Sequence, residues 1–166
     1  MANARTFTYD VALTFEDGRA SRVTAGARPA IGVAPPEDFP FGDPTAWSPE
    51  HLFLASLTSC TLLAFLAHAE NAELDVHTYT ADVSGTITRR KSDGRYAFVE
   101  IELLPRVVVG AGQSEDAHAI TSKAERDCFI SAGTTAEITV QWDISDRITA
   151  SHCSASAGAR GRIIAR

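Results

Sequence analysis

Alternating apolar and polar residues at the start of the chain predict a strand. Apolar side chains occupy every second position from Phe7 to Phe15. A period of two places these side chains on one face of a half-buried strand. The Asp17-Gly18 pair then signals a turn, so residues 21–25 are expected to return as the second strand of a hairpin.

The next segment, residues 28–47, is expected to be a long loop. It holds five prolines: Pro29, Pro35, Pro36, Pro40 and Pro44. Proline removes a backbone donor and clashes inside a helix, so this segment cannot form a regular one. Loops of this length in a compact domain are usually functional or disordered.

A buried helix is predicted from Ser48 to about Ala69. Ser48 is a favourable N-cap, proline follows at the first helical position, and Glu50 places an acid in the first turn. The helix is apolar on nearly every side, which predicts burial on most faces. Its longest uncharged stretch, residues 52–67, is slightly short for a bilayer and is broken by Ser and Thr, so we expect a core helix.

The second half of the chain predicts a hairpin, a helix and a strand. Period-two patterns at residues 75–89 and 97–103 flank a turn at 91–94. Ser114-Glu115-Asp116 begins a second helix, and a last strand follows after it. The residues expected to face the core are Tyr79, Ala81, Val83, Ile87, Ala97, Val99, Ile101 and Leu103 in the hairpin, Ala117, Ile120, Ala124 and Cys128 in the helix, and Ile138, Val140, Trp142 and Ile144 in the strand.

This order of elements predicts an α+β fold, because the strands come as antiparallel hairpins with helices between them. Residues 1–145 are expected to form one domain. Residues 146–166 are rich in Ser, Ala and Arg and are expected to form a flexible tail, in which Cys153 is an exposed thiol.

Composition narrows the classes of partner. The chain of 166 residues is 45% hydrophobic, and 21 acidic residues against 15 basic ones give a net charge of −6. This balance disfavours a nucleic acid or a membrane surface as partner, because phosphate binding needs a concentrated basic surface. The N-terminus lacks the apolar core of a secretory signal, so a cytoplasmic location is expected.

The three cysteines are too few and too scattered for a secreted disulfide framework. No Cys/His cluster has the spacing of metal ligands, and no glycine-rich nucleotide motif occurs, so no metal and no bound cofactor are expected. Inert buried thiols and reactive thiols then remain as alternatives, and composition alone favours inert thiols.

The positions of Cys60 and Cys128 in the predicted helices distinguish only weakly between an attacking and a resolving thiol. Cys60 lies in the middle of the first helix, where the helix supplies no cation. Cys128 lies near the end of the second helix and next to Asp127, which disfavours a thiolate and suits a resolving cysteine better than an attacking one. Glu50 precedes Cys60 by ten residues, about 15 Å along a helix, and on its own is an ordinary first-turn acid.

Two motifs change this balance. Two segments resemble the two cysteine motifs of the osmotically induced protein C and organic hydroperoxide resistance (OsmC/Ohr) family. The first is Ser48-Pro49-Glu50-His51-Leu52 followed by Leu57-Thr58-Ser59-Cys60, and the second is segment 123–131 around Cys128. The resemblance covers about residues 7–144, and the order of elements agrees. It therefore favours a reactive pair of cysteines over inert thiols.

The resemblance implies an intertwined homodimer, with antiparallel sheets around two long central helices and active sites at the subunit interface. It implies that Cys60 attacks a peroxide, that Cys128 resolves the sulfenic acid as a disulfide, and that an external, lipoyl-type dithiol reduces the pair. Glu50 would order an arginine that stabilises the thiolate. The loop at 39–44 has no arginine, so the candidates are Arg19, Arg22 and Arg28 near the first hairpin turn.

Three functions follow as hypotheses. The first is a thiol peroxidase for organic hydroperoxides, because the surroundings of Cys60 and Cys128 are apolar. The second is a non-catalytic stress protein that binds a small apolar ligand at the dimer cleft, motivated by the arginine missing from the loop. The third is a redox sensor that uses the same two cysteines.

Overall fold

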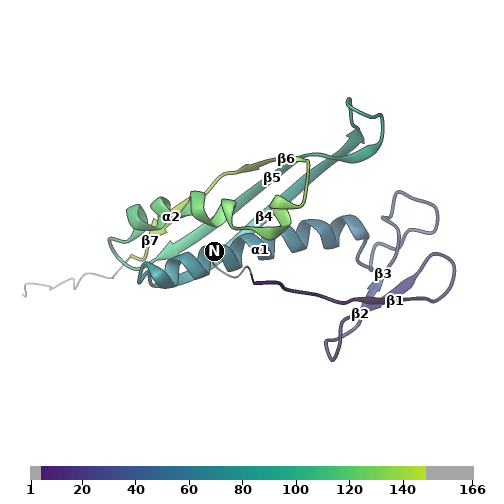
Figure 1. Ribbon diagram of the computed structural model, residues 1–166, viewed down its shortest axis with the longest axis horizontal. Coiled ribbons are helices and arrows are strands. Elements are labelled where there is room, and N and C mark those ends of the chain that lie inside the picture. The colour runs from purple at the N-terminus through teal and green to yellow at the C-terminus, as the bar shows by residue number, and fades with distance from the viewer. Residues whose placement is uncertain (1–4, 149–166) are drawn as a thin grey trace, which may run out of the picture.

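The computed structural model describes residues 5–148, which form two sheets and a layer of helices (Figure 1). The predicted tail begins at Asp146, but this residue is the last of a strand, Asp143–Asp146. The rest of the predicted tail from residue 149 onward, with Cys153, lies outside the described residues. The smaller sheet contains β1 (Ala12–Phe15), β2 (Ser21–Thr24) and β3 (Ile31–Val33). The larger sheet contains β4 (Val76–Arg89), β5 (Tyr96–Val109), β6 (Glu137–Val140) and β7 (Asp143–Asp146), and the helices are α1 (Pro49–Asn71), α2 (Ser114–Arg126) and α3 (Phe129–Ala132).

The larger sheet is mixed, so the predicted α+β class is confirmed but the predicted antiparallel pairing is wrong for the end of the chain. β4 and β5 form the expected antiparallel hairpin, whereas β6 and β7 both run parallel to β5. The reason is topological: α2 and α3 carry the chain back along the sheet, and such a crossover returns the next strand in the parallel direction.

The single last strand that the sequence predicts is divided in two. The pairing register with β5 is the same on both sides of the gap, from Leu103 opposite Val140 to Arg106 opposite Asp143. The gap therefore lies opposite Leu104 and Pro105. Because proline has no N–H to donate to a neighbouring strand, the sequence of β5 accounts for the interruption.

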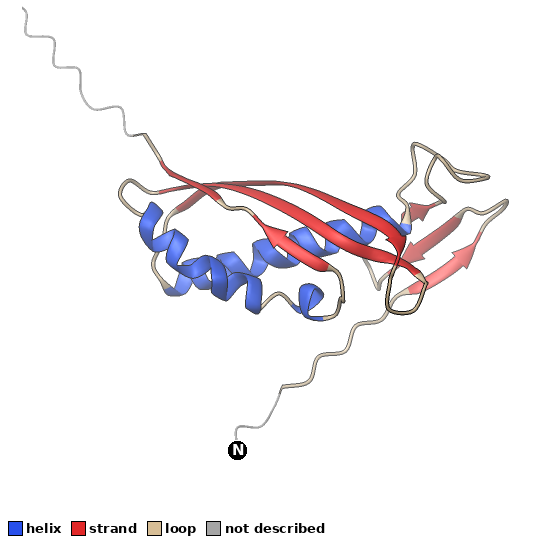
Figure 2. Cartoon of the chain, turned by 90° about the horizontal axis from the view of Figure 1, so that it is seen from above, coloured by secondary structure: helices blue, strands red, loops and turns tan. Residues whose placement is uncertain are grey.

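The predicted first helix is confirmed, and Ser48 caps it by accepting the backbone N–H of His51 at 3.2 Å. With 23 residues, α1 is longer than the apolar stretch that predicted it, and by length and composition alone it could cross a membrane. In the fold it packs against both α2 and the larger sheet, and all helices lie on one face of that sheet (Figure 2). The chain thus has one long helix and a shorter α2, where two long helices were expected.

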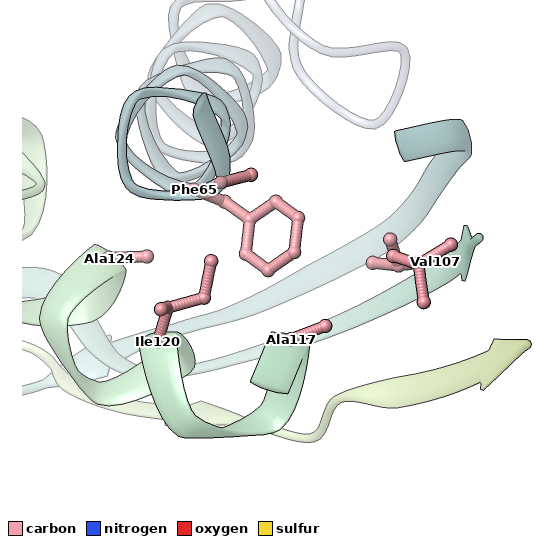
Figure 3. Packing of buried hydrophobic residues seen from close by; sticks show 7 residues of the cluster. Phe65, Val107, Ala117, Ile120 and Ala124 are labelled. Atoms are coloured by element: carbon pink, nitrogen blue, oxygen red, sulfur yellow. The ribbon is translucent and has the colours of Figure 1, made fainter. Parts of the chain in front are cut away.

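The main core lies between α1, α2 and the larger sheet (Figure 3). Phe65 of α1 is fully buried, and the Trp142 ring stacks on it at a centroid distance of 5.1 Å. The buried residues that surround Phe65 are Ala69, Val107, Val109, Ala117, Ile120 and Ala124. The predicted apolar faces of α2 and of the middle of β5 are therefore confirmed.

The N-terminal strand differs from its prediction. The strand covers only Ala12–Phe15, and the alternating apolar side chains are exposed rather than half-buried. Their exposed fractions range from 61% to 82% across Phe7, Tyr9, Val11, Leu13 and Phe15. The smaller sheet extends from the N-terminal end of α1 (Figure 1), and no second layer covers these side chains among residues 5–148.

Replacing Phe65 by alanine is expected to lower the free energy of unfolding by about 3–5 kcal/mol, because the truncation leaves a cavity under Trp142. Urea unfolding followed by circular dichroism measures this change. Glu70→Ala, at an exposed position of the same helix, should change the value by less than about 0.5 kcal/mol. Equal effects of the two substitutions would contradict this description of the core.

Candidate functional site

The two cysteines singled out by the sequence meet in the fold. Cys60 lies in the middle of α1, and Cys128 lies between α2 and α3 as the N-cap residue of α3. Both belong to one apolar cluster that includes the buried Leu57 and Ile101, where each thiol affects the pKa of the other. The packing of α3 on α1 thus joins residues that are far apart in the sequence. Cys128 is 1% exposed, whereas Cys60 is partly exposed.

The surroundings affect the two thiols in opposite directions. Burial raises the pKa of Cys60, and the neighbouring Cys128 raises it further, although backbone N–H groups of α3 act against this. Burial also acts to raise the pKa of Cys128, but the backbone N–H of Ser131 and the hydroxyl of Thr61 outweigh it, so the pKa lies below its usual value. The Ser131 N–H acts on the Cys128 sulfur, although the two groups do not form an N-cap hydrogen bond.

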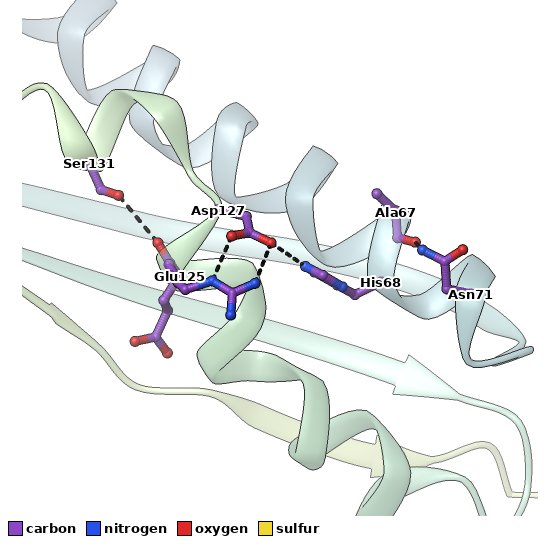
Figure 4. A network of polar contacts seen from close by, with 7 residues as sticks. Ala67, His68, Asn71, Glu125, Asp127 and Ser131 are labelled. Carbon is purple, nitrogen blue, oxygen red and sulfur yellow. Dashed lines mark hydrogen bonds and ion pairs between the residues drawn. The ribbon is translucent and has the colours of Figure 1, made fainter. Parts of the chain in front are cut away.

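The expected effect of a helix end and of Asp127 on the Cys128 thiolate is therefore not found in this fold. α2 ends at Arg126, so Cys128 lies beyond the helix rather than on it. The Asp127 carboxylate has two partners: it forms an ion pair with the guanidinium of Arg126 at 2.7 Å and contacts the imidazole of His68 at 2.9 Å (Figure 4). Arg126, and secondly His68, lower the pKa of Asp127 to about 2.

Three further residues at this junction were not identified from the sequence. His68 lies two turns after Cys60 on α1. Its imidazole contacts Asp127, the residue before Cys128, and so holds Asp127 against the helix that carries Cys60. The Thr61 hydroxyl reaches the Cys128 sulfur at 3.6 Å, and the Ser131 hydroxyl donates to the Cys128 carbonyl at 2.8 Å. Sequence spacing carries no signal for these contacts, because each depends on how α1 packs against the α2–α3 turn.

Glu50 lies in the first turn of α1, away from the two thiols. One of its carboxylate oxygens, Oε2, is buried and has no hydrogen-bond partner among the described residues. Glu50 and Arg19 line the same cavity of about 220 Å³, between the smaller sheet and the start of α1. The Arg19 guanidinium lies 5.3 Å from the ring centre of Phe41 and forms no ion pair within residues 5–148.

The other two candidate arginines have different partners. Arg22 forms an ion pair with Glu16 at 2.6 Å, and Arg28 donates to the carbonyl of Ala25 at 3.2 Å. Of the three candidates, Arg19 is the one that shares a cavity with Glu50.

Within one chain, neither Glu50 nor Arg19 is placed to contact Cys60. Ten residues separate Glu50 from Cys60 along α1, which corresponds to about 15 Å along the helix axis. Consistent with this, the main influences on the pKa of Cys60 include no Lys or Arg side chain from the described part of the chain. The single chain thus holds the sulfur pair and the Arg19–Glu50 pair as two separate groups.

A wider apolar groove of about 1010 Å³ adjoins the Arg19–Glu50 cavity. Phe53 and Phe98 stack along its wall with ring centres 4.9 Å apart, and Glu50 is its only charged lining residue. The groove can hold an apolar group next to a carboxylate. Residues 5–148 contain no group of three or more side chains suited to hold a metal ion.

The comparisons with known proteins support the resemblance seen in the motifs. The family model described as "OsmC-like protein" matches residues 42–143, well over half of the chain. Both cysteines and Glu50 lie inside the matched segment. A comparison with curated protein sequences gave no significant match.

Solved structures with similar folds cover most of the chain. An OsmC-like protein of unknown function from Vibrio cholerae has a TM-score of 0.72 at 22% identity, covering 82% of this chain and 99% of its own. An organic hydroperoxide resistance protein from Elizabethkingia anophelis gives 0.63 at 20% identity, with 86% and 100% covered. OhrB of Bacillus subtilis, also an organic hydroperoxide resistance protein, gives 0.59 at 20% identity, with 84% and 98% covered.

At these identities the structures establish the fold rather than the activity. Together with the match over residues 42–143, they show that the chain belongs to the OsmC-like protein family.

Proposed function

We propose that this protein is a thiol peroxidase that reduces organic hydroperoxides with Cys60 and Cys128. The observation that supports the proposal most directly is the position of these two cysteines, which come from separate elements and lie in one apolar cluster. A sulfenic acid formed on one sulfur would then have a resolving thiol beside it.

The difference in exposure assigns the roles. Cys60 is partly exposed and can meet a peroxide, whereas Cys128 is 1% exposed. The Cys60 thiolate attacks one peroxide oxygen, the O–O bond breaks, and the released alkoxide takes a proton to leave as an alcohol. The Cys128 thiolate then attacks the Cys60 sulfenic acid, a disulfide forms, and the hydroxyl leaves as water. An external dithiol, which the family resemblance implies is lipoyl-type, then returns both cysteines to thiols.

Cys60 requires activation, because burial raises its pKa. A cation close to the sulfur would reverse this shift. We infer that Arg19 supplies it across the interface of a homodimer, ordered by the buried, unpartnered carboxylate oxygen of Glu50. The exposed apolar side chains from Phe7 to Phe15 lie on and just before β1, the strand that leads into the turn with Arg19. They are the surface we expect the second copy to cover.

The groove beside Glu50 supports an organic substrate. Its walls are apolar and include the stacked rings of Phe53 and Phe98, so transfer of an alkyl or aryl tail from water into the groove is favourable. Hydrogen peroxide would gain nothing from this surface. We therefore propose hydroperoxides with apolar tails as substrates.

The raised pKa of Cys60 also favours a second candidate, a non-catalytic protein that binds an apolar ligand in the same groove. In that case Cys60 would stay a thiol in the presence of peroxide. Native mass spectrometry of the purified protein would then detect a bound apolar molecule, which the peroxidase does not require.

One equivalent of cumene hydroperoxide is expected to remove two hydrogens from the reduced protein and to form a Cys60–Cys128 disulfide. Intact mass and peptide mapping measure this. Cys128→Ser should instead accumulate a sulfenic acid on Cys60, and Cys60→Ser should not react. An unchanged mass of the wild-type protein would contradict the peroxidase and leave the ligand-binding candidate.

Arg19→Ala is expected to lower kcat/KM for cumene hydroperoxide by about tenfold or more, because the Cys60 thiolate loses its cation. Arg22→Ala, in the same hairpin but paired with Glu16, is the matched control and should keep near wild-type activity.

Mixed dimers locate Arg19 relative to Cys60. If the site combines two subunits, co-refolding equal amounts of Arg19→Ala and Cys60→Ser chains restores about a quarter of wild-type activity, since half of the dimers carry one complete site of two. No restored activity would show that Arg19 acts within its own chain.

Asp127→Asn is expected to slow disulfide formation, because the contact from His68 and the ion pair with Arg126 hold the turn that carries Cys128. Slower resolution leaves the sulfenic acid exposed to more peroxide, so the fraction of Cys60 sulfinic acid should rise several-fold in mass spectra. Asp116→Asn, at an exposed position on α2, is the control. Equal sulfinic fractions in both variants would show that Asp127 does not position Cys128.

A further inference from the structure

Thr61, the residue after Cys60, faces the other cysteine rather than Cys60 itself. It is 2% exposed, and its hydroxyl lies 3.6 Å from the Cys128 sulfur and 3.0 Å from the carbonyl oxygen of Leu57. A hydroxyl carries one proton and can donate to one of these two acceptors at a time. The Leu57 carbonyl also accepts the regular backbone bond of the helix, so it keeps a partner when the hydroxyl turns away.

We propose that Thr61 stabilises Cys128 as the leaving thiolate when an external dithiol reduces the Cys60–Cys128 disulfide, so that the dithiol attacks Cys60. This proposal rests on the proposed function, because it requires that the two cysteines form a disulfide. It assigns Thr61 to the reductive half of the cycle.

Two observations specify the direction of attack. Cys60 is partly exposed, whereas Cys128 is 1% exposed, so an external thiolate can reach the Cys60 sulfur alone. The sulfur that leaves then receives its electron pair in a buried position, where an unpartnered anion is unfavourable. The Thr61 hydroxyl donates to that sulfur, and a better stabilised thiolate leaves faster.

The surrounding charges are compatible with this role. Asp127, the carboxylate adjacent in sequence, is paired with Arg126 and contacts His68. The backbone N–H of Ser131 also lowers the pKa of Cys128. Thr61 donates to the sulfur from α1, the helix that also carries Cys60.

The step balances as a thiol–disulfide exchange. One thiolate of the dithiol attacks the Cys60 sulfur, the S–S bond breaks, and its electron pair stays on Cys128. The second thiol of the dithiol then displaces Cys60 from the mixed disulfide. The dithiol is oxidised to a disulfide by two electrons, and its two protons end on Cys60 and Cys128.

The test uses disulfide formed with diamide, which does not depend on peroxide turnover. Oxidised wild-type protein is incubated with glutathione, quenched with N-ethylmaleimide and mapped by mass spectrometry. We expect glutathione on Cys60 and maleimide on Cys128. The reverse labelling overturns the proposal.

The role of Thr61 is measured by the rate at which dithiothreitol reduces the same disulfide. Thr61→Val, which keeps the side-chain shape without the hydroxyl, should slow reduction by about three- to tenfold. Thr61→Ser, which keeps the hydroxyl, should restore the fast rate. Thr61→Ala, which adds no bulk, must show the same slowing, and circular dichroism checks that each variant is folded.

A further readout is the Cys128 pKa, measured by thiolate absorbance in a Cys60→Ser background. It should rise by about one unit on Thr61→Val and stay in place on Thr61→Ser. Unchanged reduction rates in a protein that turns over peroxide would refute the role of Thr61 alone. Slowed reduction in a protein without peroxide turnover would refute the peroxidase and keep the role of Thr61.

Discussion

The packing of α1 against α2, α3 and the larger sheet is the interaction on which the rest of this structure depends. Phe65 anchors α1 to α2 and to Trp142, and about one and a half turns earlier the same helix carries Cys60 next to the cluster that contains Cys128. Because one rigid helix carries both Phe65 and Cys60, the close packing around Phe65 also fixes the position of the Cys60 thiol. The site therefore needs no loop to position Cys60.

Cys128 depends on the same helix in a different way. It lies in a turn between two helices, and a turn of this kind is held by few contacts of its own. Its neighbours on α1 supply what the turn lacks: His68 binds Asp127, and Thr61 reaches the sulfur. The contact from His68 and the ion pair with Arg126 also remove most of the effect of a negative charge adjacent to a thiol.

Much of the fold could be predicted from local patterns. Ser48 and Pro49 mark the start of α1, and the apolar faces of α2 and β5 follow from their periods. The parallel direction of β6 and β7 could not be predicted, because it depends on the path of α2 across the sheet rather than on any local signal. The divided last strand was missed because its cause, Pro105, lies in a different strand.

The two thiols of the candidate site could be predicted from the sequence, but the residues that surround them could not. The motifs around Cys60 and Cys128 identified the pair, and the fold brings the two together. The expected electrostatics of Cys128 differ from the structure, since position in the sequence placed it on a helix that ends two residues earlier. Among the three candidate arginines, only three-dimensional proximity to Glu50 distinguishes Arg19.

The separation of the sulfur pair from Arg19 and Glu50 has a physical consequence for how the protein would be controlled. In a single chain, burial raises the pKa of Cys60, which disfavours the thiolate that reacts with oxidants. Activation would arrive only with the second copy, which would also cover the exposed side chains from Phe7 to Phe15. Assembly and reactivity would then be linked, because the surface that drives association leads directly into the turn that carries Arg19.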